Sequence, residues 1–164
     1  MVLLGLGVRK GATPLDGWFQ RGYDGPLSRL LVLTDAGTAQ AILVAALAAA
    51  LVRRLWALVP MMVAIPLLAV LATDTLKPWF GRLKEDALAY PSGHTTVLVV
   101  VLGLFVLAVG VRWWIIVAAA VFAALGIVGQ SVTYHYFTDT VGSVLLGTSL
   151  VCLVAASLRW SRRR

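Results

Sequence analysis

Long apolar runs follow one another along this chain of 164 residues, without the strict alternation of polar and apolar positions that marks a half-buried strand. Such runs predict helices, and five of them are each about long enough to cross a bilayer once. The expected helices cover about 36–52, 55–76, 95–111, 113–131 and 140–158. Prolines are tolerated in membrane helices, so Pro60 and Pro66 are expected to kink the second one.

Two less regular segments precede the first of these runs. Residues 1–8 are apolar but too short to span a bilayer, so they are either the end of a truncated helix or an interfacial segment. Residues from about 9 to 35 mix charges with glycine and proline, and their leucines between 27 and 33 predict a short amphipathic helix on the membrane surface.

The composition sets the class of protein. Hydrophobic residues make up 60% of the chain, too many for an ordinary soluble domain. In lipid, only helices and closed barrels satisfy every backbone polar group. We therefore expect an all-α, polytopic transmembrane helix bundle in a single domain, 1–164, with about five full spans plus an N-terminal partial span or interfacial helix. The richness in Ala, Val, Leu, Gly and Arg is typical of a high-GC bacterium.

The net charge of +7 concerns topology rather than nucleic acid, which we do not expect as a partner. With five spans, seven cations fall on each side of the membrane. One side holds Arg53, Arg54, Arg112, Arg159, Arg162, Arg163 and Arg164. The other side holds Arg9, Lys10, Arg21, Arg29, Lys77, Arg82 and Lys84, together with all seven acids. Three of the second set, Lys77, Arg82 and Lys84, form a cluster that we interpret below as functional rather than as a topology signal. We therefore place the first side and the C-terminus in the cytoplasm of a plasma-membrane protein.

The only two histidines, His94 and His135, each stand where an apolar run begins. Two bilayer crossings of about 20 residues lie between them, so both return to the same face, which we expect to be extracytoplasmic. Asp139 follows His135 by four residues, which on a helix puts the two on one side. A carboxylate there can hold one ring nitrogen and leave the other free to attack or to carry a proton.

An anion site is expected at the same face. Ser92 and Gly93 immediately precede an apolar helix, whose N-terminal amides and small glycine let a phosphate approach closely. Three cations, Lys77, Arg82 and Lys84, lie within one short loop upstream. Phosphoryl transfer is catalysed chiefly by positioning and charge neutralisation, so no metal or other cofactor is required.

These residues resemble the motifs of the phosphatidic acid phosphatase type 2 superfamily, the integral-membrane lipid phosphate phosphatases. That family carries Lys-x6-Arg-Pro, then Pro-Ser-Gly-His, then Ser-Arg-x5-His-x3-Asp. The second motif is complete here in residues 91–94, the third keeps His135 and Asp139, and the first keeps Lys77. The resemblance extends from about residue 15 to the end of the chain.

The resemblance implies a two-step hydrolysis of a lipid phosphate or diphosphate. His135 attacks phosphorus and forms a phosphohistidine, while Asp139 orients and stabilises its ring. His94 protonates the leaving oxygen and then helps to activate water. The residues implied to hold the phosphate are Lys77, Lys84, Ser92 and Gly93. Implied substrates are phosphatidic acid, phosphatidylglycerol phosphate or a polyprenyl phosphate.

The chain departs from the family at two arginines. The arginine of the first motif is Lys84, and the Ser-Arg of the third motif is Val128-Gly129. Lysine keeps a charge but lacks the bidentate fork of arginine. Three nearby residues are expected to compensate: Arg82, Gln130 and Tyr134. Whether the enzyme is slow, specialised for an unusual headgroup or inactive stays open at this point.

Other interpretations stay open as well. The histidines would serve as haem ligands, or with Asp139 as zinc ligands, although no further ligand motif accompanies them. A degenerate protein that binds lipid phosphate, or scaffolds an envelope enzyme, fits the missing arginines. A phosphotransferase, in which an alcohol replaces water, fits the same residues.

Overall fold

The computed structural model describes residues 1–8, 11–23 and 25–161. Arg9, Lys10, Asp24 and Arg162–Arg164, which enter the charge count above, lie outside the described residues. The elements, in chain order, are α1 (Val2–Val8), α2 (Pro14–Gln20), the 3-10 helix η1 (Pro26–Thr34), α3 (Ala36–Val52), α4 (Val59–Phe80), β1 (Leu83–Lys84), β2 (Ala87–Leu88), α5 (Gly93–Val109), α6 (Trp113–Val132) and α7 (Phe137–Ser161).

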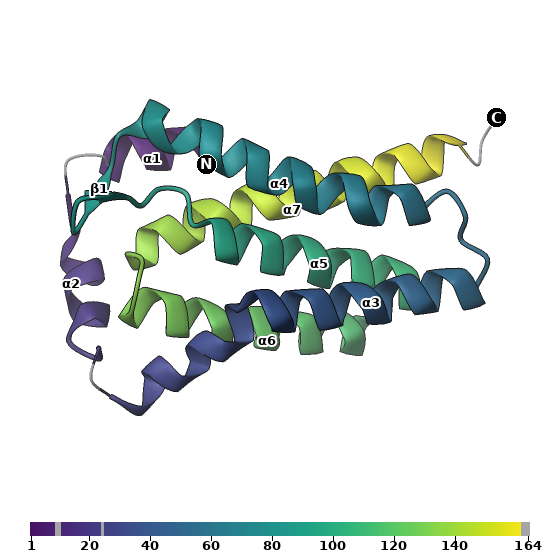
Figure 1. Ribbon diagram of the computed structural model, residues 1–164, viewed down its shortest axis with the longest axis horizontal. Coiled ribbons are helices and arrows are strands. Elements are labelled where there is room, and N and C mark those ends of the chain that lie inside the picture. The colour runs from purple at the N-terminus through teal and green to yellow at the C-terminus, as the bar shows by residue number, and fades with distance from the viewer. Residues whose placement is uncertain (9–10, 24, 162–164) are drawn as a thin grey trace.

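Five long helices, α3 to α7, lie side by side along the molecule, and α1, α2 and the β-hairpin gather at one end (Figure 1). The central helix is α5, which contacts α3, α4, α6 and α7. Its buried residues Val100, Leu104 and Ala108 form one core with Ala46 of α3 and Met62 of α4. The prediction of an all-α bundle is confirmed, apart from the two-residue strands of the hairpin.

Each of the five apolar runs becomes a helix. The helix α3 has the expected bounds, α4 and α5 keep the expected length but are shifted by a few residues along the chain, and α7 extends beyond its expected range at both ends. In the described part of the chain, α4, α6 and α7 are long and apolar enough to cross a membrane, and η1 with α3, bent by 45°, forms a fourth candidate. At 17 residues α5 is shorter, and 1.5 Å per residue gives it roughly 25 Å against a hydrocarbon core of about 30 Å. By length and composition, three or four candidate spans are therefore present in the described part of the chain, fewer than the five we expected.

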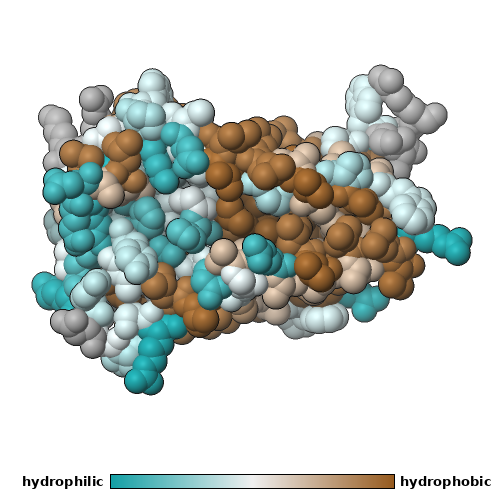
Figure 2. All heavy atoms as spheres, viewed as in Figure 1, coloured by the Kyte–Doolittle hydropathy of each residue, from teal (hydrophilic) through white to brown (hydrophobic). Residues whose placement is uncertain are grey.

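The surface agrees with membrane insertion. Hydrophobic side chains cover the flank of the long helices, while hydrophilic ones gather at the end that holds α1, α2 and the hairpin (Figure 2). On α4, Val63, Leu67 and Leu71 are all exposed at a spacing of four residues, which is one face of a helix. A bundle with such an apolar flank suits lipid better than water.

The structure also places the two prolines of α4 and the two segments that precede α3. Pro60 lies in the first turn of α4, where proline costs no hydrogen bond, whereas Pro66 lies inside the helix. The segment expected as a surface amphipathic helix is η1, which packs along α6. The apolar N-terminus forms the short helix α1, which packs on Phe80 and Tyr90 at the polar end of the bundle.

Candidate active site

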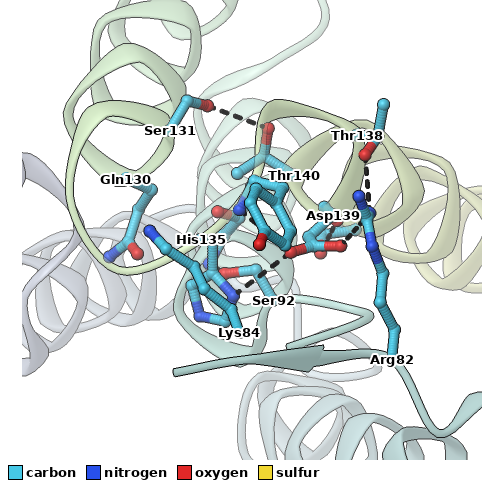
Figure 3. A network of polar contacts seen from close by, with 12 residues as sticks. Arg82, Lys84, Ser92, Gln130, Ser131, His135, Thr138, Asp139 and Thr140 are labelled. Carbon is cyan, nitrogen blue, oxygen red and sulfur yellow. Dashed lines mark hydrogen bonds and ion pairs between the residues drawn. The ribbon is translucent and has the colours of Figure 1, made fainter. Parts of the chain in front are cut away.

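A cavity of about 620 Å³ opens at this polar end of the bundle, between α3, α4, the hairpin, α5 and the turn that joins α6 to α7. Six of the residues singled out in the sequence line it: Lys77, Lys84, Gly93, His94, Tyr134 and His135. Both histidines therefore reach one cavity, although the two helices α5 and α6 separate them in the sequence. The turn between α6 and α7, with His135 and Lys84 gathered beside it, is seen in Figure 3.

The first turn of α5 presents His94 and Gly93 to the cavity. Ser92 caps this helix, and its hydroxyl accepts a hydrogen bond from the Thr95 amide at 3.4 Å. A Cβ on Gly93 would lie only 4.0 Å from the ammonium nitrogen of Lys77. A helix N-terminus and a cation thus meet at one point, which is the arrangement that anions favour.

Ser92 itself is fully buried and does not line the cavity. Its hydroxyl shapes the end of α5, and its carbonyl accepts a hydrogen bond from the Thr96 hydroxyl. Of the two residues predicted to hold phosphate at this helix start, Gly93 lines the cavity, whereas Ser92 does not and instead caps the helix.

His135 lies two residues before α7, in a turn that is held by hydrogen bonds from another helix, α2. The Gln20 amide of α2 donates hydrogen bonds to the carbonyl oxygens of Ser131, at 2.6 Å, and of His135, at 3.2 Å. The His135 backbone amide also donates to the Gln130 carbonyl at 3.0 Å. These hydrogen bonds fix the backbone that carries the His135 imidazole at the cavity. Gln20 was not identified as a site residue from the sequence.

Asp139 stands near His135 without bonding it. The His135 Nδ1 and Asp139 Oδ2 atoms are 3.9 Å apart, beyond hydrogen-bond length. Oδ2 instead accepts the Tyr136 amide at 3.0 Å, and Nδ1 is buried without a hydrogen-bond partner among the described residues. Catalytic hydrogen bonds are often long in ligand-free sites and shorten when substrate binds. A movement of about 1 Å would form the expected pair.

Arg82 occupies a different place from the predicted one. It is fully buried, and its Nη1 donates to Asp139 Oδ1 at 2.5 Å and to the Thr138 hydroxyl at 2.6 Å (Figure 3). Its Nη2 donates to Asp16 Oδ2 at 2.9 Å. The guanidinium also lies 4.5 Å from the centre of the Tyr136 ring. Arg82 is therefore no cavity cation, because both ends of its guanidinium fork are bound to carboxylates.

Asp16 is a second residue of the candidate site that was not identified from the sequence. Burial by itself would raise its pKa, but hydrogen bonds from Thr13, Thr138 and Arg82 hold the pKa below its ordinary value. Asp16 Oδ1 accepts the Thr138 amide at 2.9 Å, so it also fixes the start of α7. The Thr-x-x-Asp spacing of a capping box was visible in residues 13–16. It marks the start of α2 but not the long-range partner.

Lys84 is delivered by the hairpin, in which Lys84 pairs with Ala87. It is buried, lines the cavity, and its ammonium donates to the Thr133 carbonyl. Burial lowers the pKa of Lys84, and the negative charges of Glu85 and the two buried aspartates oppose this only in part. Lys77 also lines the cavity and forms an exposed ion pair with Asp74 at 3.4 Å.

Of the other two residues expected to compensate for the missing arginines, Tyr134 lines the cavity and Gln130 does not. Tyr134 lines the cavity and is largely exposed, so it can reach a bound ligand. Gln130 is buried, and its amide donates to the Thr34 hydroxyl of η1 at 2.7 Å. It does not line the cavity, so the prediction that Gln130 helps to bind phosphate is wrong for this arrangement.

Gly129, where the family motif has arginine, faces the backbone of η1. A Cβ on Gly129 would lie 2.5 Å from the carbonyl carbon of Leu30 and from the amide nitrogen of Leu31. No side chain fits in that space. In this fold η1 therefore closes the position to which the motif comparison assigns an arginine.

Replacing Gly129 by alanine is expected to destabilise the protein by about 1–3 kcal/mol, because the added methyl group must push two backbones apart. The midpoint of chemical unfolding in detergent measures this. Gly17→Ala is the control, since nothing lies within 4 Å of that added carbon. A Gly129→Ala protein as stable as wild type would mean that η1 does not rest on α6 in this way.

Among the described residues, no group of three His, Cys, Asp or Glu side chains is arranged to hold a metal ion. The zinc interpretation therefore has no ligand set in that part of the chain. Comparison with family models, with curated proteins and with solved structures finds no significant match to this chain.

Proposed function

We propose that this protein is an integral-membrane lipid phosphatase that hydrolyses a lipid phosphate or diphosphate at the extracytoplasmic surface. The observation that carries the proposal is the single cavity lined by His94, His135, Lys77 and Lys84 at the polar end of an apolar helical bundle. In this proposal α3 to α7 each cross the membrane, with η1 extending α3 and the residues around α5 completing its crossing. The C-terminus is then cytoplasmic.

The mechanism follows from the positions of the imidazoles. Nδ1 of His135 faces Asp139, which leaves Nε2 to attack phosphorus. The bond from phosphorus to the lipid oxygen breaks, and His94 gives that oxygen a proton. A water molecule then attacks the phosphohistidine and gives a proton to His94. The phosphorus–nitrogen bond breaks, and inorganic phosphate leaves.

Charge neutralisation falls to the two lysines and to the start of α5. Lys77 and Lys84 approach the cavity from different elements, α4 and the hairpin, so they can contact different phosphate oxygens. The amides of the first turn of α5 add dipolar stabilisation beside Gly93. Together they take the part of the missing arginines, with weaker geometric control because an ammonium is a point charge.

The deeper walls of the cavity support a lipid rather than a water-soluble phosphate. They are apolar and come from three helices: Leu43 of α3, Pro66 and Val70 of α4, and Val97 and Val101 of α5. A hydrocarbon chain can lie against them while its phosphate stays among the polar groups at the mouth. Phosphatidic acid, phosphatidylglycerol phosphate and polyprenyl phosphates all have this form.

The test measures phosphate release by the purified protein from long-chain lipid phosphates and from a short, soluble phosphate monoester. Wild type is expected to release phosphate from at least one long-chain substrate, and more slowly from the soluble one, while His135→Ala releases none above background. If wild type releases no more phosphate than His135→Ala from any substrate, the hydrolase proposal fails. Product analysis with added alcohols separates a transferase from a hydrolase.

One alternative has its own support. The arginine position at Gly129 is closed by η1, and His135 stands 3.9 Å from its carboxylate. Both features fit a protein that binds lipid phosphate without turnover. Binding of a lipid phosphate that is equal in wild type and His135→Ala, without hydrolysis in either, would favour this alternative.

Replacing Lys84 by arginine is expected to extend activity to higher pH. Burial lowers the pKa of Lys84, so its positive charge is lost at a lower pH than that of an ordinary lysine, and phosphate binding weakens there. Arginine stays charged throughout this range. The profile of kcat/KM against pH checks the result, with Lys77→Arg as the matched control. An alkaline limb that does not move in Lys84→Arg would contradict the assignment.

A further inference from the structure

A second cavity, of about 520 Å³, lies at the opposite end of the bundle from the histidines. It is bordered by the turn after α3 and by the C-terminal ends of α5 and α7. Three arginines line it, Arg53, Arg54 and Arg159, together with Trp56 and the apolar residues Leu58 and Leu107. The site thus combines cations with a hydrophobic floor.

These three cations have no counter-charge within the described chain. No Asp or Glu lines this cavity, and the acids that the structure describes belong to segments of the histidine end. Within the described residues, the side chains of Arg54 and Arg159 make no hydrogen bond or ion pair, whereas the Arg53 guanidinium donates to the Ala108 carbonyl at 2.6 Å. At the histidine end, by contrast, Lys77 and Arg82 each pair with a carboxylate.

The turn that carries two of the arginines is fixed by backbone geometry. Arg53 reaches the end of α5, where a Cβ on Gly110 would lie only 3.3 Å from its Nη1. Arg54 has a φ of 55°, in the left-handed region that L-residues rarely adopt. An arginine held there projects beside the cavity rather than continuing α3. The unpaired charges are thus presented together and not spread along a flexible loop.

The depth of the cavity corresponds to the headgroup layer of a bilayer. Trp56 is 65% exposed at its rim, and Trp113 and Trp114 of α6 are exposed where α6 begins, near the end of α5. Exposed tryptophans concentrate at the membrane–water interface. Arginines between helices at that depth, above apolar side chains, can bind a phosphate whose acyl chains follow the bundle. Free phosphate would gain nothing from the apolar floor.

We propose that this cavity is a binding site for the headgroup of an anionic phospholipid in the leaflet opposite the histidines. Arg54 and Arg159 contact the phosphate, and Arg53 links the site to the end of α5. The lipid is held there as a ligand and is not hydrolysed, because no nucleophile lines the cavity among the described residues. The proposal does not depend on the phosphatase activity.

The experiment measures binding of phosphatidylglycerol and of phosphatidylcholine to the full-length protein by native mass spectrometry and by the shift in Tm. Wild type is expected to prefer phosphatidylglycerol, and the double variant Arg54→Gln/Arg159→Gln to bind it about tenfold or more weakly. Arg112→Gln is the matched control, because Arg112 is an exposed arginine next to α6 that does not line the cavity. It is expected to bind as wild type does.

Two further arms make the result decisive. Arg21→Gln should bind phosphatidylglycerol normally, because that exposed arginine lies at the end of α2 and lines neither cavity. Arg54→Lys/Arg159→Lys should fold like the glutamine variant and keep part of the affinity. Equal loss in Arg112→Gln, no preference for phosphatidylglycerol in wild type, or full competition by inorganic phosphate would each overturn the proposal. Normal binding by the double glutamine variant would do so as well.

Discussion

His135→Ala is expected to lower the rate of phosphate release by about 10³-fold or more, because it removes the group that forms the covalent intermediate. The variant should fold, because the turn is held through the backbone of His135 rather than through its imidazole. The Gln20 side-chain amide donates to the His135 carbonyl, and the His135 backbone amide donates to the Gln130 carbonyl. Initial rates of phosphate release, with Tm measured on the same samples, give the result.

The intermediate itself separates the two histidines. With a substrate whose leaving group needs no proton, His94→Ala should still form the phosphohistidine but hydrolyse it slowly, because the group that activates water is absent. A phosphoprotein that is stable to alkali and labile to acid should therefore accumulate in His94→Ala and never in His135→Ala. Accumulation in both variants would show that another residue is the nucleophile.

Arg82→Met is expected to cost about 3–5 kcal/mol of folding free energy, because it leaves the buried carboxylates of Asp16 and Asp139 without their shared cation. Breaking a buried pair is costly even where the intact pair adds little net stability. Unfolding midpoints in detergent measure the loss. Arg21→Met, an exposed arginine at the end of α2, is the control and should change stability by less than about 0.5 kcal/mol.

The same cluster gives stability a defined pH dependence. Since the pKa of Asp16 is lowered in the folded protein, its contribution is complete above the ordinary carboxyl pKa and is lost as the pH falls through the folded value. Asp16→Asn should remove this part of the acid limb and leave the neutral range less stable. An unchanged acid limb in Asp16→Asn, or an Arg82→Met protein as stable as the Arg21→Met control, would show that the cluster does not hold α2 to α7.

The helices and the grouping of the histidines follow from local information. Apolar runs of about 17–25 residues form helices in any apolar surrounding, because their backbone groups bond within the segment. The two successive helices α5 and α6 then bring His94 and His135 to one end of the bundle, and both line the same cavity. The Ser92 cap likewise follows from residue type and place.

Long-range packing set the roles of the remaining charged and polar residues. Lys84 and Arg82 are two residues apart, yet one lines the cavity and the other is buried between carboxylates from α2 and α7. In a strand, alternate residues share a face, so local pattern gives no reason to separate them. Asp16, which pairs with Arg82, lies in a segment whose sequence indicates only the start of a helix.

The sequence by itself determined that the chain forms an apolar helical bundle and that two imidazoles and a lysine meet at one end of it. The tertiary structure alone decided which cations face the cavity, that η1 closes the position of the motif arginine at Gly129, and that three arginines meet at the far end. The physical reason is range. Helix formation depends on neighbouring residues, whereas the partner of a buried charge depends on which distant segments pack against it.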